Sequence, residues 1–122
     1  MIGYATIGTN DLAKATAFYE KVLAEIGGKR VFGNERMVMF GAGQGQPMLA
    51  VCTPFDGKKA TVGNGMMIAL NAGSEDKVKK VYAKALELGG KDEGPPGARG
   101  TGFFGGYFRD LDGNKLVAFK MG

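Results

Sequence analysis

The chain contains no histidine, and its single cysteine is Cys52. The absence of histidine removes the commonest metal ligand and the commonest general acid or base at neutral pH. One cysteine cannot form a disulfide within the chain, so we expect a reducing, cytoplasmic location. No apolar run approaches the roughly 18 residues of a membrane-spanning helix, and no charged-then-apolar signal segment opens the chain. We therefore expect no membrane association.

The positive charge is also small and dispersed. The net charge is +4, and a nucleic-acid binder would usually concentrate its cations and place aromatic residues among them. We therefore expect no nucleic-acid partner. The length of 122 residues suits one domain with ordinary globular composition. The dispersed lysines, which resemble those of solvated helix faces, are Lys14, Lys21, Lys58, Lys59, Lys77, Lys79, Lys80 and Lys84.

The first half of the chain predicts a strand, a helix and three further strands. Residues 2–8 are partly β-branched and end in glycine, which is typical of a strand. Asn10 is the expected N-cap of a helix, because apolar residues recur at helical spacing from Leu12 to Ile26. Gly27 and Gly28 are expected to end it. The three strands that should follow cover residues 29–33, 35–41 and 47–53.

The second half repeats this plan. Residues 66–72 predict a strand, and Ser74 is the expected cap of a second helix with an apolar stripe from Val78 to Leu88. The helix ends in LGGKD, as the first ends in IGGKR. After a stretch rich in proline and glycine, residues 102–110 and 114–121 predict a hairpin. The matching order indicates two βαβββ modules.

These modules define the expected fold. It is an α+β fold in which the modules form a cup-shaped, mainly antiparallel sheet with helices on its outer face. We expect a single domain over residues 1–122, made of modules at about 1–56 and 64–122. The face away from the helices would form a concave, apolar pocket of the kind that binds small molecules.

The stretch DLDGNK, residues 110–115, places oxygen-bearing side chains at alternate positions, as a calcium loop does. An EF-hand loop requires glycine at its sixth position and glutamate at its twelfth, whereas here Gly113 is fourth and Met121 is twelfth. Asp112-Gly113 is instead a strong turn dipeptide between two strand-like segments. The stretch predicts a hairpin turn and no calcium site.

Two motifs together resemble a known superfamily. TIGTNDLAKATAFYEKVL near the start, YFRDLDGNKLVAF near the end and the paired modules are similar to the vicinal oxygen chelate superfamily. This group includes glyoxalase I, bleomycin-resistance proteins and extradiol dioxygenases. The resemblance covers essentially the whole chain. It implies a cup whose enzymatic members hold a divalent metal, which acts as a Lewis acid on vicinal substrate oxygens or activates dioxygen.

The metal-ligand positions implied by the resemblance carry unsuitable side chains. The histidines of the two first strands correspond to Tyr4 and Met67, the glutamate beyond the final turn corresponds to Val117, and its counterpart falls near Ala50. A phenol, a thioether and aliphatic groups do not provide the imidazole and carboxylate donors of such sites. We therefore expect no metal and no cofactor.

Three other candidates for chemistry are weaker than their structural interpretations. Cys52 could be a nucleophile, but no histidine can activate it, and we expect a buried thiol. The sequence GAGQGQ at 41–46 lacks the Gly-Lys-Ser/Thr ending and the following helix of a phosphate-binding loop. Glu35 and Arg36 could project into the cup, but we expect them at a solvated edge.

The resemblance and the residues lead to a functional hypothesis. We expect a metal-independent member of the bleomycin-resistance type that forms a homodimer and binds a small, partly aromatic ligand in an apolar cup. The alternatives are a metal-dependent or atypical lyase, isomerase or dioxygenase, with Tyr4 or Glu35 in acid–base roles, and a structural role with a filled cup. No catalytic residue is assigned. The expected ligand-binding residues are Tyr4, Arg36, Met67, Tyr107, Arg109 and Val117.

Overall fold

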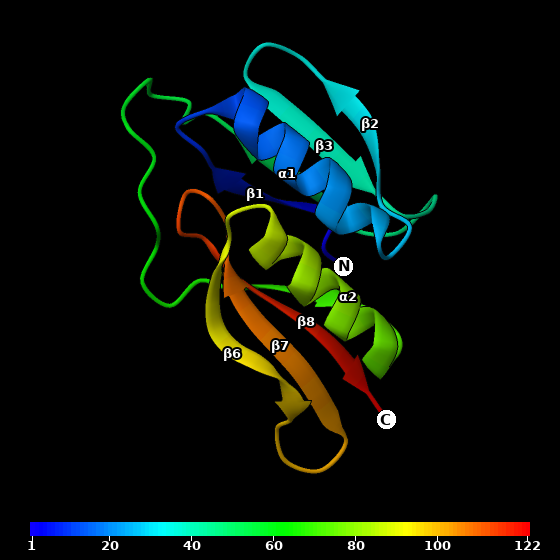
Figure 1. Cartoon of the computed structure of the whole chain (residues 1–122). Coiled ribbons are helices and arrows are strands. Elements are labelled where there is room, and N and C mark those ends of the chain that lie inside the picture. Colours follow the sequence, from blue (N-terminus) through cyan, green and yellow to red (C-terminus); the bar gives the residue numbers. More distant parts are fainter. The chain divides into compact units, whose positions relative to one another are not determined.

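The computed structural model describes residues 1–122, which divide into two compact units, Met1–Val62 and Gly63–Gly122. Each unit contains one helix and four strands (Figure 1). The first unit consists of β1 (Tyr4–Gly8), α1 (Leu12–Ala24), β2 (Lys29–Gly33), β3 (Met37–Gly41) and β4 (Met48–Cys52). The second consists of β5 (Ile68–Asn71), α2 (Glu75–Glu87), β6 (Lys91–Ala98), β7 (Phe103–Arg109) and β8 (Lys115–Met121).

The two sheets have the same topology. The strand order is β1-β4-β3-β2 in the first sheet and β5-β8-β7-β6 in the second. In each sheet the first strand of the unit pairs in parallel with the last, and the remaining pairs are antiparallel. The expected α+β fold of two βαβββ modules is confirmed, in the form of two open, mixed sheets with four strands each.

The helix starts follow from their capping residues. The Ser74 side chain accepts a hydrogen bond from the Lys77 amide at 3.2 Å, as expected for the cap of α2. The expectation that Asn10 caps α1 is wrong, because Asp11 does so by accepting from the Lys14 amide at 3.1 Å. Asn10 instead binds Ala60 through both backbone groups, accepting from its amide at 2.7 Å and donating to its carbonyl at 3.3 Å. This contact fixes the segment that follows β4 on the first unit.

Both helices end in the same glycine motif. Gly27 and Gly89 have φ values of +81° and +102°, in the left-handed region that glycine enters without strain. The following glycine then returns a hydrogen bond to the helix, from the Gly90 amide to the Ala85 carbonyl at 2.8 Å in the second unit. A Cβ atom at Gly90 would lie 2.8 Å from the carbonyl oxygens of Ala85 and Arg109. The repeated Gly-Gly pair therefore sets the helix-to-strand turn in each module.

Strand β6 was not located by the sequence, which indicates only a connection rich in proline and glycine there. Pro95 and Pro96 lie inside it. Proline lacks the N–H that a central strand needs, but it is tolerated at a sheet edge, where β6 lies. The register with β7 shifts between Asp92 and Gly94 and again before Gly97, so the strand has no regular two-residue pattern to recognise.

The core of each unit lies between its helix and one face of its sheet (Figure 1). Helix α1 contacts β2, β3 and β4, and helix α2 contacts β6, β7 and β8. Alternate strand residues face the helix because successive side chains of a strand point to opposite sides. The buried strand residues on the helix-facing sides are Ile7, Val38, Phe40, Leu49 and Val51 in the first unit and Phe108, Leu116 and Ala118 in the second. Neither helix is long and apolar enough to cross a membrane.

Tyr82 on α2 joins the helix to β6. Its hydroxyl donates to Asp92 Oδ1 at 2.7 Å, and the Gly94 amide donates to the same oxygen at 2.8 Å. Burial, followed by the hydrogen bond to Asp92 and its charge, raises the pKa of Tyr82 to about 12. The hydrogen bonds from Tyr82 and Gly94 lower the pKa of the Asp92 carboxyl.

The hydrogen bond between Tyr82 and Asp92 predicts a loss of unfolding free energy at alkaline pH. Because the folded-state pKa is raised from 10.0 to about 12, the contribution of Tyr82 is complete below pH 10 and is lost as the pH rises to about 12. Tyr82→Phe should therefore lose less unfolding free energy than the wild type across this window. Urea unfolding at a series of pH values measures this difference, and parallel losses in the two proteins would contradict it.

Candidate ligand-binding site

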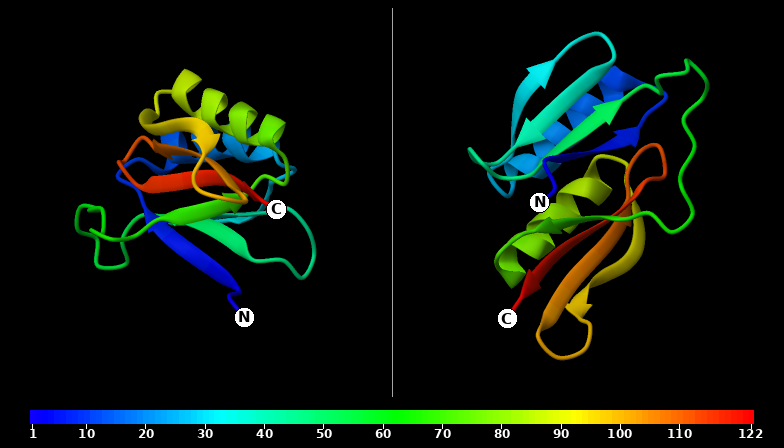
Figure 2. Two further views of the ribbon diagram at one scale, coloured as in Figure 1. Left: turned by 90° about the horizontal axis from the view of Figure 1, so that it is seen from below. Right: turned by 180° about the vertical axis from the view of Figure 1, so that it is seen from behind.

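Each sheet has one face that its helix does not cover. We call these the first open face, on the sheet of β1 to β4, and the second open face, on the sheet of β5 to β8. The view from behind in Figure 2 shows the strands of each sheet in front of its helix. Strand alternation and register place the side chains that face away from α1, which are Tyr4, Thr6, Phe32, Met37, Met39, Met48, Ala50 and Cys52.

The first open face is apolar and rich in methionine. Met37, Met39 and Met48 are partly exposed, while Tyr4 and Phe32 expose about half of their area. Ala50 is fully buried. Methionine is flexible and polarisable, so such a surface adapts to apolar ligands of irregular shape. Cys52 is buried at the end of β4, in agreement with the expected buried thiol.

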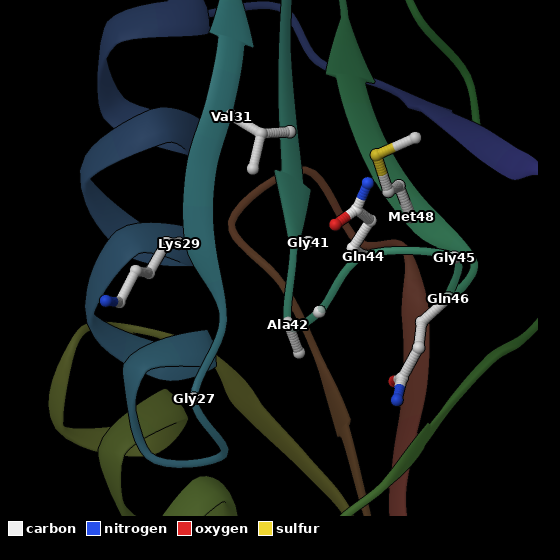
Figure 3. A pocket seen from close by; sticks show the side chains of 10 residues that line it. Gly27, Lys29, Val31, Gly41, Ala42, Gln44, Gly45, Gln46 and Met48 are labelled. Carbon is white, nitrogen blue, oxygen red and sulfur yellow. The ribbon is translucent and has the colours of Figure 1, made fainter.

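A pocket of about 650 Å³ lies at the end of this face, where the loop of residues 42–46 joins β3 to β4. Figure 3 shows Val31 on β2 and Met48 on β4 on either side of Gly41. A Cβ atom at Gly41 would lie 3.2 Å from Met48 Cγ, so glycine keeps the floor open. Gln44, Gln46 and Lys29 supply the polar lining. The GAGQGQ segment therefore forms a pocket wall, a role that the sequence interpretation did not assign.

The second open face is aromatic along β7 and β8. The rings of Phe103 and Phe119 stack with centroids 5.5 Å apart and an interplanar angle of 9°. Gly105 lies beneath this pair, because a Cβ atom there would be 2.9 Å from Phe103 Cε2. Next along the strands, Tyr107 pairs with Val117 in the antiparallel register. The face therefore presents stacked rings beside a phenol, whereas Val117, with 1% of its area exposed, is buried beneath them.

Two cations flank the Tyr107 ring. Arg99 Cζ and Lys115 Nζ each lie 5.6 Å from its centroid, within cation–π range. Arg109 lies two residues after Tyr107, on the same side of β7, and its guanidinium already has protein partners. Its Nε forms an ion pair with Glu93, and its Nη1 donates to the Gly113 carbonyl at 3.0 Å. Arg99 and Lys115 were not among the expected site residues.

The six expected ligand-binding residues divide between the units. Tyr107, Arg109 and Val117 come together on the second open face, because β7 and β8 are adjacent antiparallel strands. Met67 directly precedes β5 in the same unit and is 43% exposed.

The other two residues lie in the first unit. Tyr4 belongs to the first open face. Arg36 is engaged just before β3, where Nη1 donates to the Thr53 carbonyl at 2.8 Å and the guanidinium lies 5.6 Å from the Phe55 ring centroid. Its contacts indicate that Arg36 fixes the chain after β4.

The metal-ligand positions implied by the sequence resemblance carry a phenol at Tyr4, a methyl group at Ala50, a thioether at Met67 and an isopropyl group at Val117. In the described chain, no three histidine, cysteine, aspartate or glutamate side chains lie together in a group that could hold a metal ion. This donor set does not fit a divalent metal of the oxygen- or imidazole-binding type. No chemical step is therefore assigned to a metal here.

Two repeated βαβββ units, each with one sheet face that its helix does not cover, define a class of small α+β proteins. The family model described as Glyoxalase/Bleomycin resistance protein/Dioxygenase superfamily matches residues 1–118. The chain therefore belongs to this superfamily, and the resemblance drawn from its sequence motifs is confirmed. A search of curated proteins finds no match to the chain.

Solved structures agree with this assignment. A glyoxalase/bleomycin resistance protein from Albidiferax ferrireducens T118 is 29% identical, with a TM-score of 0.93 over 100% of this chain and 99% of that one. A glyoxalase-related enzyme from Fulvimarina pelagi is 23% identical, with a TM-score of 0.78 over 98% and 87%. A lactoylglutathione lyase from Agrobacterium tumefaciens is 21% identical, with a TM-score of 0.72 over 98% and 92%. The last two show the shared fold alone.

Proposed function

We propose that this protein binds a small, partly aromatic organic molecule on its open faces and needs no catalytic metal to do so. The observation that carries the proposal is the second open face, where the stacked Phe103–Phe119 pair lies beside Tyr107. Aromatic side chains provide large contact areas at a small loss of conformational entropy. Phe103, Tyr107 and Phe119 are each partly exposed, which leaves their rings available to a flat ligand.

The first open face supports the same proposal. Its methionines and the pocket of about 650 Å³ provide adaptable apolar surface within the size range of small-molecule sites. The side chains at the implied metal positions favour binding without a metal. A homodimer remains part of the proposal, and the oligomeric state in solution would test it.

The contrary hypothesis is an atypical lyase, isomerase or dioxygenase in which Tyr4 or Glu35 acts as an acid or base. Metal analysis of protein purified without chelator, followed by a methylglyoxal–glutathione assay, separates the two hypotheses. A stoichiometric metal together with turnover would overturn the proposal. We expect neither of these results.

Removal of one stacked ring tests the binding proposal directly. Bicyclic aromatic compounds should raise the melting temperature of the wild type, because a ligand of the native state stabilises it. Phe119→Ala should weaken their binding about tenfold, equivalent to about 1.4 kcal/mol. The matched control is Phe55→Ala, which removes a ring that is 91% exposed and lies outside both open faces. Equal weakening in both variants, or no ligand-induced shift in the wild type, would contradict the proposal.

A further inference from the structure

We propose that the ligand is an aromatic organic anion and that Arg99 and Lys115 bind its negative group beside Tyr107. This inference rests on the proposed function and specifies the chemistry of the ligand. It is carried by the position of Arg99, which the turn between β6 and β7 fixes over the second open face. The hydrogen bonds of the guanidinium, the charges around it and the aromatic surface beside it support the inference in turn.

Backbone carbonyls hold the Arg99 guanidinium in place. Nη2 donates to the Pro95 carbonyl at 2.6 Å, and Nη1 lies 3.4 Å from the Ala98 carbonyl. Gly94 and Gly97 leave room for the planar group, since added Cβ atoms would lie 3.3 Å from Nη2 and 2.8 Å from Nη1. A guanidinium has five N–H donors, and these contacts leave some of them for a ligand. The group is therefore positioned before any ligand arrives.

No carboxylate forms an ion pair with this group or with Lys115. The ion pairs in the structure are Lys80–Asp76, Lys84–Glu87 and Arg109–Glu93, and they include neither Arg99 nor Lys115. Both cations nevertheless lie 5.6 Å from the same ring centroid. Two like charges near one apolar ring create a positive potential that an anion relieves. A carboxylate could accept two parallel hydrogen bonds from arginine, which also fixes its orientation.

The neighbouring surface specifies the rest of the ligand. Lys115, Val117 and Phe119 follow one another on the open side of β8, and Phe119 stacks on Phe103. A strand rises about 3.3 Å per residue, so Lys115 and Phe119 are separated by about 13 Å along β8. Side chains from both ends shorten this gap. We therefore expect a carboxylate attached to one or two aromatic rings to reach from the cations toward the stacked rings.

Arg99 also has a structural alternative, in which it only ties the β6–β7 turn through the Pro95 and Ala98 carbonyls. That role would affect stability but would not distinguish an acid from its amide. The affinity ratio of 2-naphthoate to 2-naphthamide is therefore the decisive measurement. These probes have the same rings and differ in the charge of one group.

Isothermal titration of the full chain with both probes tests the inference. We expect the wild type to bind 2-naphthoate at least tenfold more tightly than 2-naphthamide. Arg99→Gln and Lys115→Gln should each weaken 2-naphthoate binding about tenfold and leave 2-naphthamide binding unchanged. Lys58→Gln, which removes an exposed lysine between β4 and β5, is the charge control and should retain the wild-type ratio.

A further variant moves the guanidinium without removing its charge, and a second variant is its control. Gly97→Ala places a Cβ atom 2.8 Å from Arg99 Nη1, at the end of a flexible side chain, so the group must shift while the fold remains. We expect this variant to lower the acid-to-amide ratio. Gly3→Ala, where a Cβ atom meets nothing within 4 Å, should not change it.

The outcomes separate the inference from the proposed function. Equal affinity for both probes would overturn the anion inference and leave the binding proposal intact. A preference for the acid that persists in Arg99→Gln and Lys115→Gln would overturn the assignment of these two residues. If neither probe binds and the wider aromatic panel gives no thermal shift, both the inference and the proposed function fail.

Discussion

Truncation of Tyr19 to alanine is expected to lower the free energy of unfolding by about 4 kcal/mol, in the range of large-to-small changes in a packed core. Tyr19 is fully buried on α1. Its ring meets Phe18 edge-on at 5.0 Å between centroids and lies 6.3 Å from Phe40 on β3. The variant therefore leaves a cavity between helix and sheet that the surrounding side chains fill only in part. Urea unfolding followed by circular dichroism measures the loss.

The matched control is Tyr4→Ala, on the opposite face of the same sheet. Tyr4 is 50% exposed and faces away from α1. Its removal should lower the unfolding free energy by less than about 1 kcal/mol, because little buried area is lost. Similar losses in the two variants would mean that the assignment of covered and open faces is wrong. Tyr4→Ala is also informative for ligand binding, since Tyr4 is an expected contact residue.

Asp110→Ala is the second large effect, with an expected loss of about 3 kcal/mol of unfolding free energy from buried donors left without partners. Oδ1 accepts from the amides of Asp112 and Asn114, both at 2.9 Å, and Oδ2 accepts from Asn114 Nδ2 at 2.9 Å. Asp110 and Asn114 expose only 5% and 4% of their area. Their hydrogen bonds build the turn that joins β7 to β8. Chemical denaturation of the variant measures the loss.

Asp56→Ala provides the control for Asp110→Ala. Asp56 makes the same kind of local contact, accepting from the Lys58 amide at 2.9 Å, but in an exposed loop. Water replaces that hydrogen bond, so a loss below about 1 kcal/mol is expected. A loss at Asp110 no larger than that at Asp56 would show that burial does not strengthen the turn.

Both helices and most strands could be predicted from the sequence because their signals are local. The apolar periodicity, the Ser74 cap and the Gly-Gly helix ends each depend on a few neighbouring residues. The Asp112-Gly113 turn was predicted for the same reason, and Gly113 has the positive φ of +91° that such a turn requires. The cap of α1 was misplaced by one residue, because Asn10 and Asp11 are both good caps and Asn10 is used by Ala60, 50 positions away.

The site could be predicted only in part. Strand alternation puts Tyr107, Arg109 and Val117 on one face, and this follows from the register of a hairpin. Arg99 could not be placed in the same way, because its position depends on the two register shifts of β6 and on the space above Gly94 and Gly97. Glu93 likewise reaches Arg109 only through that irregular strand. Whether a cation has a carboxylate partner therefore depends on long-range strand pairing, which local sequence patterns do not reveal. Arg109 has such a partner, whereas Arg99 and Lys115 have none.

The prolines of β6 also bear on self-association. An edge strand with free N–H and C=O groups can recruit a strand from another molecule, and proline removes the donors on which such pairing depends. Pro95 and Pro96 lie in the middle of β6, the outer strand beside β7, and Pro96 packs over Gly106 with its Cγ 3.1 Å from the position of a Cβ atom there. The other edge strand of this sheet is β5. A homodimer that continues this sheet would therefore use β5, because the prolines of β6 hinder the addition of another strand.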